Sequence, residues 1–202
     1  AFRRPLLARR VHHRGRELFE NSLADRERLA ARAPENVEYK KALVSSLAWL
    51  GEAREKEGRL EDGLASRERE IAFLQPYIDD PKSDTHFRRD AIVAYRAAGR
   101  LNAVRGNLAK GIAQLRAGVR VGEALLVSEP QNTDWAAMTA WVKFELARLE
   151  LARRNVDEAS LLTSSFCDTA DRLFARDSTV VDWRLDLRSA CLEMRVRTAL
   201  AR

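Results

Sequence analysis

The sequence predicts an all-α fold, a right-handed α-solenoid of about eight helices arranged as antiparallel hairpins. Three features recur at one spacing and predict this class. The first is a set of aromatic residues 48 positions apart, namely Tyr39, Phe87, Trp135 and Trp183. The second is a turn tripeptide at 58–60, 106–108 and 154–156, and the third is a proline at 34, 81 and 130, the middle one being a residue early. A fixed period between about 20 and 50 residues is the sequence signature of a solenoid.

The first complete hairpin shows the helical period on both arms. Its first arm places apolar side chains three or four residues apart, at Tyr39, Leu43, Leu47, Leu50 and Ala53. Its second arm continues at helical intervals, at Leu60, Leu64, Ile71, Leu74 and Ile78. Neither arm alternates as a strand would. Gly58 between them can adopt the left-handed conformation that ends a helix sharply.

Eight helices are expected in order along the chain. The first begins near Leu6 or Arg14 and ends at Arg32, with an inward row formed by Leu18, Leu23 and Leu29. The others are expected at 36–57, 60–79, 84–105, 108–128, 132–153, 156–176 and 180–202. Pro76 is expected to bend or tighten the last turn of its helix. Residues that can cap the first helix of a hairpin recur along the chain, with Asn36, Asp84 and Asn132 in phase and Ser178 two residues early.

The chain divides into a short basic segment and a long repetitive one. Residues 1–16 are expected to form a basic linker or the start of the first helix, and 17–202 the solenoid. The repeats are placed at about 36–83, 84–131 and 132–179, with a final half-repeat at 180–202. The net charge of +6 lies in the basic segment, where six arginines precede the first acid, Glu17. This segment could contact an anionic surface, or it could be a solvated linker, which is the interpretation we favour.

Other function classes find little support in the sequence. Phe2 is the one aromatic residue of the basic segment, so we expect no specific nucleic-acid contact. The three histidines are His12, His13 and His86, and no glycine-rich phosphate loop or paired metal-ligand spacing accompanies them. We therefore expect no enzymatic activity, no metal and no cofactor. No apolar run approaches the ~18 residues of a membrane span, and no secretory signal is visible. Residue 1 is Ala, so we expect a piece of a longer chain.

The repeat resembles the tetratricopeptide (TPR) family. The resemblance is carried by Leu47, Leu50, Gly51, Gly58 and Leu60, and by small residues where the second helix crosses the first, Gly63, Gly111 and Ala159. Two departures are clear: the period is 14 residues longer than the family's 34, and Arg67 and Leu115 replace the family's large aromatic residue. The long helices are similar to TPR-like arrays of bacterial signalling and transcriptional-activator proteins, which often follow a separate effector domain. This resemblance implies a non-enzymatic protein–protein interaction scaffold in the cytoplasm, or else a soluble region of a membrane-anchored protein.

The resemblance also implies where a partner would bind. In such solenoids the first helix of each hairpin lines a concave face. The family's groove positions correspond here to Arg89, Arg96, Arg100, Trp141, Phe144 and Arg148. Arginines beside exposed aromatic rings are typical of binding hot spots, and an acidic or C-terminal-carboxylate peptide is the expected partner. The alternative is that Trp141 and Phe144 merely pack between helices.

The last helix and the two cysteines leave further alternatives open. Leu185, Leu192 and Val196 fall on groove positions of a helix that is apolar on more than one face. We therefore expect this end to be covered, either by a symmetric copy in a homodimer or by residues outside this sequence. A dimerisation segment without a separate ligand is therefore the alternative function. Cys167 and Cys191 lie equally far from Thr179, which would place them at one height of an antiparallel hairpin. A disulfide is sterically conceivable, but we favour reduced thiols packed in the core.

Overall fold

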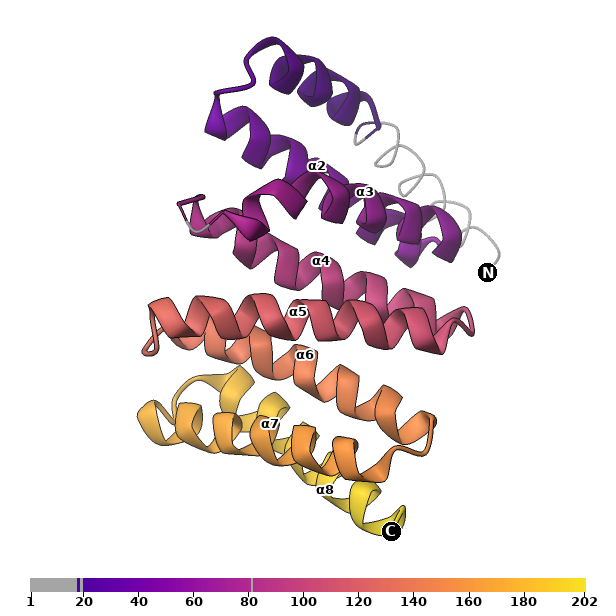
Figure 1. The fold of residues 1–202 in the computed structure, drawn as a ribbon, viewed down its shortest axis with the longest axis vertical. Helices are drawn as coiled ribbons and strands as arrows, with labels where there is room; N and C mark the ends of the chain where they lie inside the picture. Colours follow the sequence, from indigo (N-terminus) through magenta and orange to yellow (C-terminus); the bar gives the residue numbers. More distant parts are fainter. Residues whose placement is uncertain (1–17, 19, 81) are drawn as a thin grey trace, which may run out of the picture. The chain divides into compact units, whose positions relative to one another are not determined.

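The computed structural model describes residues 18, 20–80 and 82–202, and the chain divides into two compact units after Asp80. The basic segment, with its six arginines and its expected surface contact, lies outside the described residues. Every regular element in the described part of the chain is helical, as Figure 1 shows, so the predicted all-α class is confirmed. The two units are described separately.

The first unit contains a helix over 20–32, followed by α2 (Val37–Lys56) and α3 (Leu60–Asp79). Its core joins Leu23 to the inward residues of α2, Leu43, Leu47 and Leu50. The expected inward row of the preceding helix is wrong at two positions, because Leu18 and Leu29 are exposed. α3 continues through Pro76 to Asp79.

A buried ion pair occupies the place where the TPR family has an aromatic residue. Arg67 Nη1 lies 2.8 Å from Glu70 Oε2, one turn further along α3, and both side chains are buried. A charge removed from water is tolerated when a partner of opposite sign accompanies it. The departure at Arg67 is therefore compensated within the same helix.

The second unit contains α4 (Thr85–Val104), α5 (Leu108–Ser128), α6 (Thr133–Ala152), α7 (Val156–Arg176), a π-helical turn η1 (Asp182–Leu187) and α8 (Arg188–Leu200). Each helix packs against the next along the chain. α4 also contacts α6, and α6 contacts α8. These three helices, which occupy the first position of successive repeats, therefore form one layer. The unit is a solenoid of antiparallel hairpins, as the sequence predicts (Figure 1).

The turns inside the hairpins use the left-handed conformation. Gly58 has φ 79° and Gly106 has φ 84°, and the third turn places Arg154 at φ 64°. Because the left-handed region crowds a Cβ atom, glycine is the usual residue there. Arg154 adopts it without that advantage, which shows that the packing of α6 on α7 dictates this turn.

Side-chain caps begin three of the four first helices. The carbonyl oxygens of Asn36 and Asn132 accept from the backbone N–H groups of Tyr39 and Trp135, and Asp84 accepts from His86. The prediction that Ser178 caps the fourth of these helices is wrong. In its place Asp177 accepts from both the backbone and the hydroxyl of Thr179, which shapes the loop before η1.

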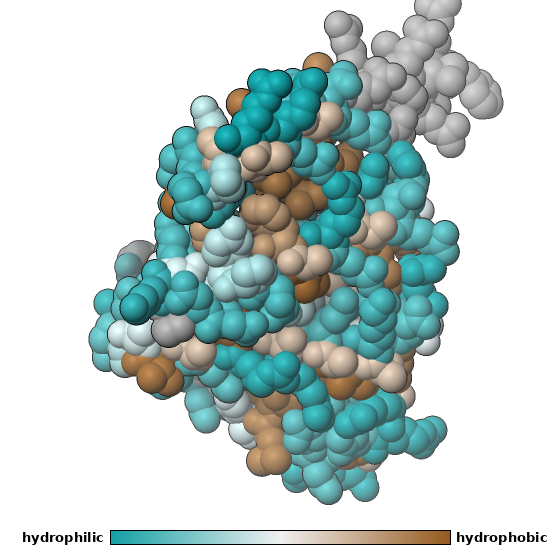
Figure 2. All heavy atoms as spheres, turned by 45° about the horizontal axis from the view of Figure 1, so that its top comes forward, coloured by the Kyte–Doolittle hydropathy of each residue, from teal (hydrophilic) through white to brown (hydrophobic). Residues whose placement is uncertain are grey.

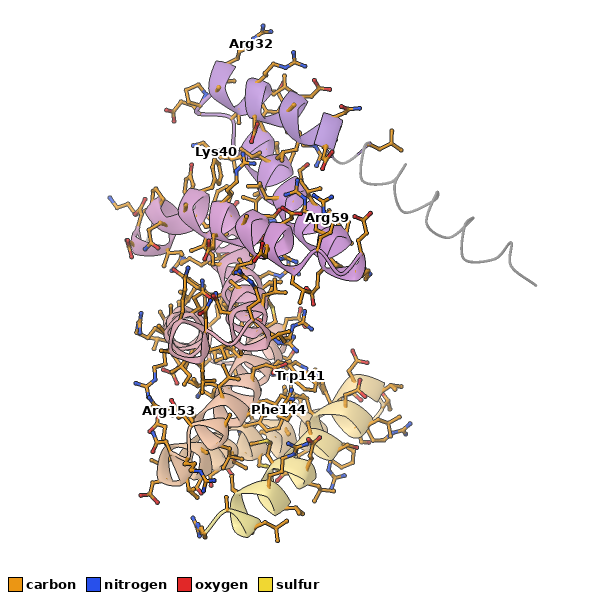
Figure 3. The ribbon with its side chains drawn as sticks, turned by 90° about the vertical axis from the view of Figure 1, so that its right-hand side faces the viewer. Arg32, Lys40, Arg59, Trp141, Phe144 and Arg153 are labelled. Atoms are coloured by element: carbon orange, nitrogen blue, oxygen red, sulfur yellow. A yellow bond between two sulfur atoms is a disulfide. The ribbon has the colours of Figure 1, made fainter. Side chains whose placement is uncertain are left out.

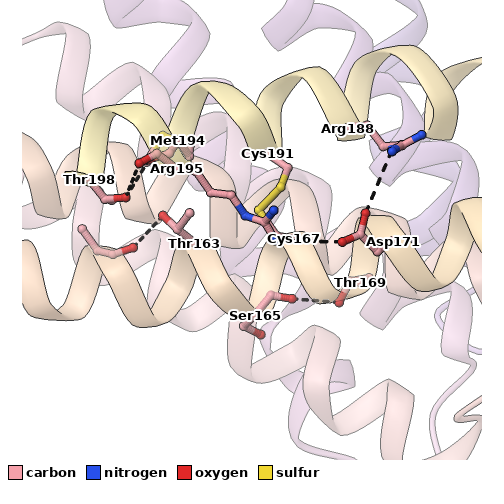
Figure 4. Close-up of a disulfide and its surroundings, with 11 residues drawn as sticks. Thr163, Ser165, Cys167, Thr169, Asp171, Arg188, Cys191, Met194, Arg195 and Thr198 are labelled. Atoms are coloured by element: carbon pink, nitrogen blue, oxygen red, sulfur yellow. Dashed lines mark hydrogen bonds and ion pairs between the residues drawn. A yellow bond between two sulfur atoms is a disulfide. The ribbon is translucent and has the colours of Figure 1, made fainter. Parts of the chain in front are cut away.

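A disulfide joins the last two helices, so the expectation of reduced thiols is wrong. Cys167 of α7 and Cys191 of α8 are bonded, with their Cα atoms 5.2 Å apart (Figure 4). Both residues belong to a buried cluster with Phe144, Phe166 and Met194. The equal distance of the two cysteines from the turn does place them at one height, and packing of α8 on α7 turns the sulfurs together.

Two negative findings concern the described part of the chain only. None of its helices has both the length and the apolar character needed to cross a membrane. Among the same residues, no group of three or more His, Cys, Asp and Glu side chains is arranged to hold a metal ion. Most atoms on the face seen in Figure 2 belong to hydrophilic residues, and apolar residues appear between them in small groups.

Candidate functional site

The layer formed by α4, α6 and α8 carries a cavity of about 440 Å³. Its charged lining comes from all three helices: Arg100 of α4, Glu145 and Arg148 of α6, and Arg197 of α8. Glu145 is the one acid among the residues that line it, and the rest of the wall is apolar, including Leu115 and Leu149. We call this cavity and the adjoining side chains of Arg96 and Trp141 the arginine groove.

Aromatic rings support the groove from beneath. Trp141 meets Phe144 edge to face, with ring centroids 5.4 Å apart, and both residues are labelled in Figure 3. The ring centroid of Phe144 also lies 5.4 Å from that of Phe166. Phe144 is only 8% exposed and belongs to the core, so it cannot serve as an open contact surface. This burial favours the alternative that Phe144 packs between helices. Trp141 is half-buried and remains partly accessible.

Two guanidinium groups are held over these rings. The Arg96 guanidinium lies 5.4 Å from the centroid of Trp141, and that of Arg148 lies 5.6 Å from the centroid of Phe144. Such cation–π contacts orient an arginine without removing its charge. The planar ends of both arginines are therefore fixed in direction at the groove.

A single buried carboxylate lies between the same two arginines. Glu145 is 8% exposed; its Oε2 accepts from Arg148 Nη1 at 3.2 Å, and its Oε1 lies 3.7 Å from Arg96 Nη2. Burial lowers the pKa of Arg96 most strongly, the attraction of Glu145 raises it, and repulsion from Arg100 lowers it again. Arg96 is thus partly shielded from water, whereas Arg100, Arg148 and Arg197 are exposed. An incoming carboxylate could form charge-assisted hydrogen bonds with these exposed guanidinium groups.

The structure brings together most, but not all, of the residues expected from the sequence. Arg96, Arg100, Trp141 and Arg148 gather at the groove. Arg89 is exposed in the second turn of α4, lies 3.7 Å from Asp90 and does not line the cavity. Of the residues expected at the C-terminal contact, Leu185, Leu192 and Val196 are all solvent-exposed.

Two residues of the groove were not expected from the sequence. Glu145 follows Phe144 directly, and one acid among several on a helix gives no sign that it is buried. Arg197 follows Val196, the position that the repeat places in the groove. A long arginine side chain can reach a surface from a neighbouring helical position. Arg197 could have been predicted if long side chains one residue away from a groove position had also been counted as groove residues.

Comparison with known proteins supports the fold. No family model matches this chain, and no match was found among curated proteins. The crystal structure of BtubC (BKLC) from P. vanneervenii is similar over 95% of this chain and 73% of that chain, with a TM-score of 0.59 and 16% sequence identity. A crystal structure of a Podosopora anserina putative kinesin light chain with nearly identical TPR-like repeats covers 96% of this chain and 83% of that chain, with a TM-score of 0.48 and 16% identity. The likeness to BtubC shows a shared helical-repeat fold, and the fold alone.

Proposed function

We propose that this protein is a non-enzymatic interaction scaffold whose arginine groove binds an acidic peptide. The observation that carries the proposal is that Arg100, Arg148 and Arg197 line one cavity with a single acid, Glu145, and that half-buried Trp141 adjoins it through Arg96. Arginine and tryptophan are enriched among residues that dominate binding energy. Guanidinium groups also bind carboxylates through two parallel hydrogen bonds. A peptide that ends in a free carboxylate, or carries Asp or Glu, fits this surface.

The wider setting belongs to the same proposal. The resemblance of the repeat to long TPR-like arrays favours the sensor or interaction region of a larger bacterial signalling or transcriptional regulatory protein. Residues 17–202 would form the array, with repeats of 48 residues at 36–83, 84–131 and 132–179 and a half-repeat at 180–202. The starts of α2, α4 and α6 at Val37, Thr85 and Thr133 support this division.

A binding measurement tests the groove. Fluorescence anisotropy would compare a labelled peptide ending in three acidic residues with its C-terminally amidated form and with a neutral peptide. We expect the free acid to bind most tightly. Replacement of both Arg100 and Arg197 by Gln should weaken binding by about tenfold or more, since each charge-assisted hydrogen bond contributes about 1.5–3 kcal/mol.

A matched variant controls for the loss of charge. The variant Arg28→Gln/Arg32→Gln removes two exposed arginines of the helix over 20–32, which line neither this cavity nor any other described here, and should bind the acidic peptide as the wild type does. Arg96 is unsuited to the test, because its loss would leave buried Glu145 with one partner fewer. Equal binding of acidic and neutral peptides by the wild type would refute the proposal.

A second candidate function is dimerisation through the C-terminal helix. Leu185, Leu192 and Val196 are 51%, 63% and 58% exposed, while the opposite side of the helix is buried through Cys191 and Met194. A two-fold contact between two copies would cover this apolar stripe. Light scattering at micromolar concentration should then give twice the monomer mass, and Leu192→Glu/Val196→Glu should restore the monomer. A wild-type monomer would exclude this function.

The disulfide bears on the compartment. Disulfides persist mainly in oxidising compartments and are uncommon in the cytosol. The bond between Cys167 and Cys191 therefore favours placement as an extracytoplasmic region of a membrane-anchored protein over the cytoplasmic placement expected from the resemblance. Alkylation of thiols in acid-quenched cells, followed by mass spectrometry, decides the point. Quantitative alkylation of both cysteines would restore the cytoplasmic placement.

A further inference from the structure

A second cavity lies on the α7 side of α6, apart from the arginine groove. It has a volume of about 500 Å³ and is bounded by the end of α5, the first half of α6 and the second half of α7. None of its lining residues belongs to the arginine groove. Figure 4 shows two of its hydroxyl residues, Ser165 and Thr169, on the side of α7 away from the disulfide. A volume of this order matches the sites that bind small molecules in proteins.

The lining of this cavity is positively charged. It includes Lys143, Arg172 and Arg176, and none of the residues that line it is Asp or Glu. Lys143 Nζ is already neutralised, because it lies 2.9 Å from Glu123 Oε1 and 3.0 Å from Ser165 Oγ. The two arginines differ from Lys143 in their partners.

Arg172 and Arg176 form no ion pair with any described residue. The Arg172 guanidinium donates to Thr169 Oγ1 at 3.2 Å, and that of Arg176 donates to the Gln131 carbonyl oxygen at 2.8 Å. Both acceptors are neutral. Because the arginines stand four residues apart on α7, they lie on one face of the helix. Three acids are near them in sequence. Asp171 lies within 4.0 Å of Arg188 and Arg195 of α8, Asp177 accepts from Thr179, and Asp168 forms no ion pair with Arg172 in the described part of the chain. Two positive charges at the cavity therefore lack a counter-charge.

The start of α6 adds to the same field. Thr133, the first residue of α6, lines the cavity together with its cap Asn132. The first N–H groups of a helix have no acceptor within the helix, and the helix dipole favours an anion at this end. Asn132 already accepts from the Trp135 N–H, and Asp134 in the first turn offsets part of the dipole, so this contribution is small beside that of the two arginines.

The remaining wall of the cavity is apolar. It is formed by Leu126, Pro130, Ala136, Ala140 and Leu173. A fully charged ion would leave this surface in contact with water, whereas a ligand with an apolar body would cover it. Burial of apolar area contributes about 25 cal/mol per Å². The chemistry of the lining thus calls for a ligand with a charged head and an apolar part.

We propose that this cavity binds a small organic anion, a phosphate monoester or carboxylate, with its head between Arg172, Arg176 and the start of α6. The apolar part of the anion packs against Leu126, Ala136 and Leu173. This site is independent of the arginine groove and of the peptide proposed there. It would give the scaffold a second input, a metabolite-sized ligand on one face and a peptide on the other.

Nuclear magnetic resonance titration tests the site with defined probes. Phenyl phosphate, benzoate, inorganic phosphate and benzyl alcohol would each be added to ¹⁵N-labelled protein. We expect saturable shifts at the amides of Thr133, Thr169 and Arg172 with phenyl phosphate or benzoate, weaker effects with inorganic phosphate and none with benzyl alcohol. The tighter-binding probe of phenyl phosphate and benzoate identifies the head group as phosphate or carboxylate. Equal shifts with benzyl alcohol, or none with any probe, would overturn the proposal.

Two variants separate the charged head from the apolar wall. Arg172→Gln/Arg176→Gln should weaken phenyl phosphate binding by about tenfold or more, since charge-assisted hydrogen bonds are lost. Ala136→Leu should weaken phenyl phosphate more than inorganic phosphate, because it fills the apolar part of the cavity. The variant Arg28→Gln/Arg32→Gln, which removes two exposed arginines that line neither cavity, serves as the control and should leave every probe unaffected. Wild-type affinity in the Arg172/Arg176 variant contradicts the site, whatever the peptide measurements show.

Discussion

The hairpin α4–α5 and the hairpin α6–α7 have nearly the same helix lengths but pack in different ways. In α4–α5 the backbones approach closely: a Cβ atom added at Gly111 would lie 2.7 Å from the carbonyl oxygen of Gly99. In α6–α7 the helices are separated by large side chains, and Phe144 and Phe166 meet at 5.4 Å. α8 is then fastened to α7 by the disulfide. The difference shows that hairpins of one repeat length can pack either through close backbones or through aromatic side chains between the helices.

The largest effect is expected where the aromatic filling is removed. Phe166 is fully buried against Phe144 and Trp141, so Phe166→Ala should lower the free energy of unfolding by about 3–5 kcal/mol. Chemical denaturation followed by circular dichroism measures this loss. Leu161→Ala on the exposed side of the same helix is the control and should cost less than about 0.5 kcal/mol. Similar losses for both variants would show that α7 is not packed as described.

Removal of the disulfide should have the next largest effect. Its two cysteines are separated by 24 positions, and cross-linking a loop of that size stabilises a protein by about 3 kcal/mol. Cys167→Ser/Cys191→Ser should therefore unfold at a lower denaturant concentration than the wild type. Dithiothreitol should destabilise the wild type and leave the double variant unchanged. A wild type that does not respond to the reductant would contradict the bond.

The close approach of α4 and α5 is tested by adding a methyl group. Gly111→Ala forces a Cβ atom against a backbone oxygen that cannot move alone, and overpacking of this kind costs about 1–3 kcal/mol. The higher helix propensity of Ala recovers part of that loss, about 1 kcal/mol. Gly63→Ala in the first unit, where the nearest oxygen is 3.2 Å away, should cost less. A larger loss of stability in Gly63→Ala than in Gly111→Ala would mean that the backbone distance does not control the packing.

The smallest effect concerns the loop between α7 and η1. Hydrogen bonds from the hydroxyl and then the backbone of Thr179 lower the pKa of Asp177 below its ordinary value. The stabilisation by this charged carboxylate is present above the pKa of the unfolded state and is lost as the pH falls through the folded pKa. In Thr179→Ala the pKa of Asp177 should rise toward the ordinary value. A carboxyl ¹³C titration of both proteins measures the change, and equal values would exclude the hydroxyl as its cause.

The sequence predicts the helices far better than it predicts their contacts. Helix ends follow from local signals, so Asn36, Asn132 and Gly106 mark boundaries that the structure reproduces to within a residue. The groove follows in part, since the repeat places Arg96, Arg100, Trp141 and Arg148 on one face. The burial of Phe144 does not follow, because a position on the groove side of α6 can still face α7 when that helix carries Phe166. Burial depends on the partner helix as well as on the period.

The disulfide and η1 escaped prediction for the same reason. Whether two sulfurs meet depends on the rotation of α8 about its axis, and this rotation is set by tertiary packing and not by the spacing of cysteines. The π-helical turn over Asp182–Leu187 depends likewise on hydrogen bonds that no residue in the segment demands. Arg197 illustrates the third limit, because a long flexible side chain extends beyond the position that its helix assigns to it.

The bond between Cys167 and Cys191 also determines how tension would travel through the protein. A force that pulls on the chain beyond residue 191 passes through the sulfur bridge directly into α7. The 24 positions between the two cysteines, including η1, are bypassed and cannot be extended. Fully stretched, that loop would measure about 80 Å. Reduction would release this length, so the oxidised molecule is the shorter and stiffer of the two under load.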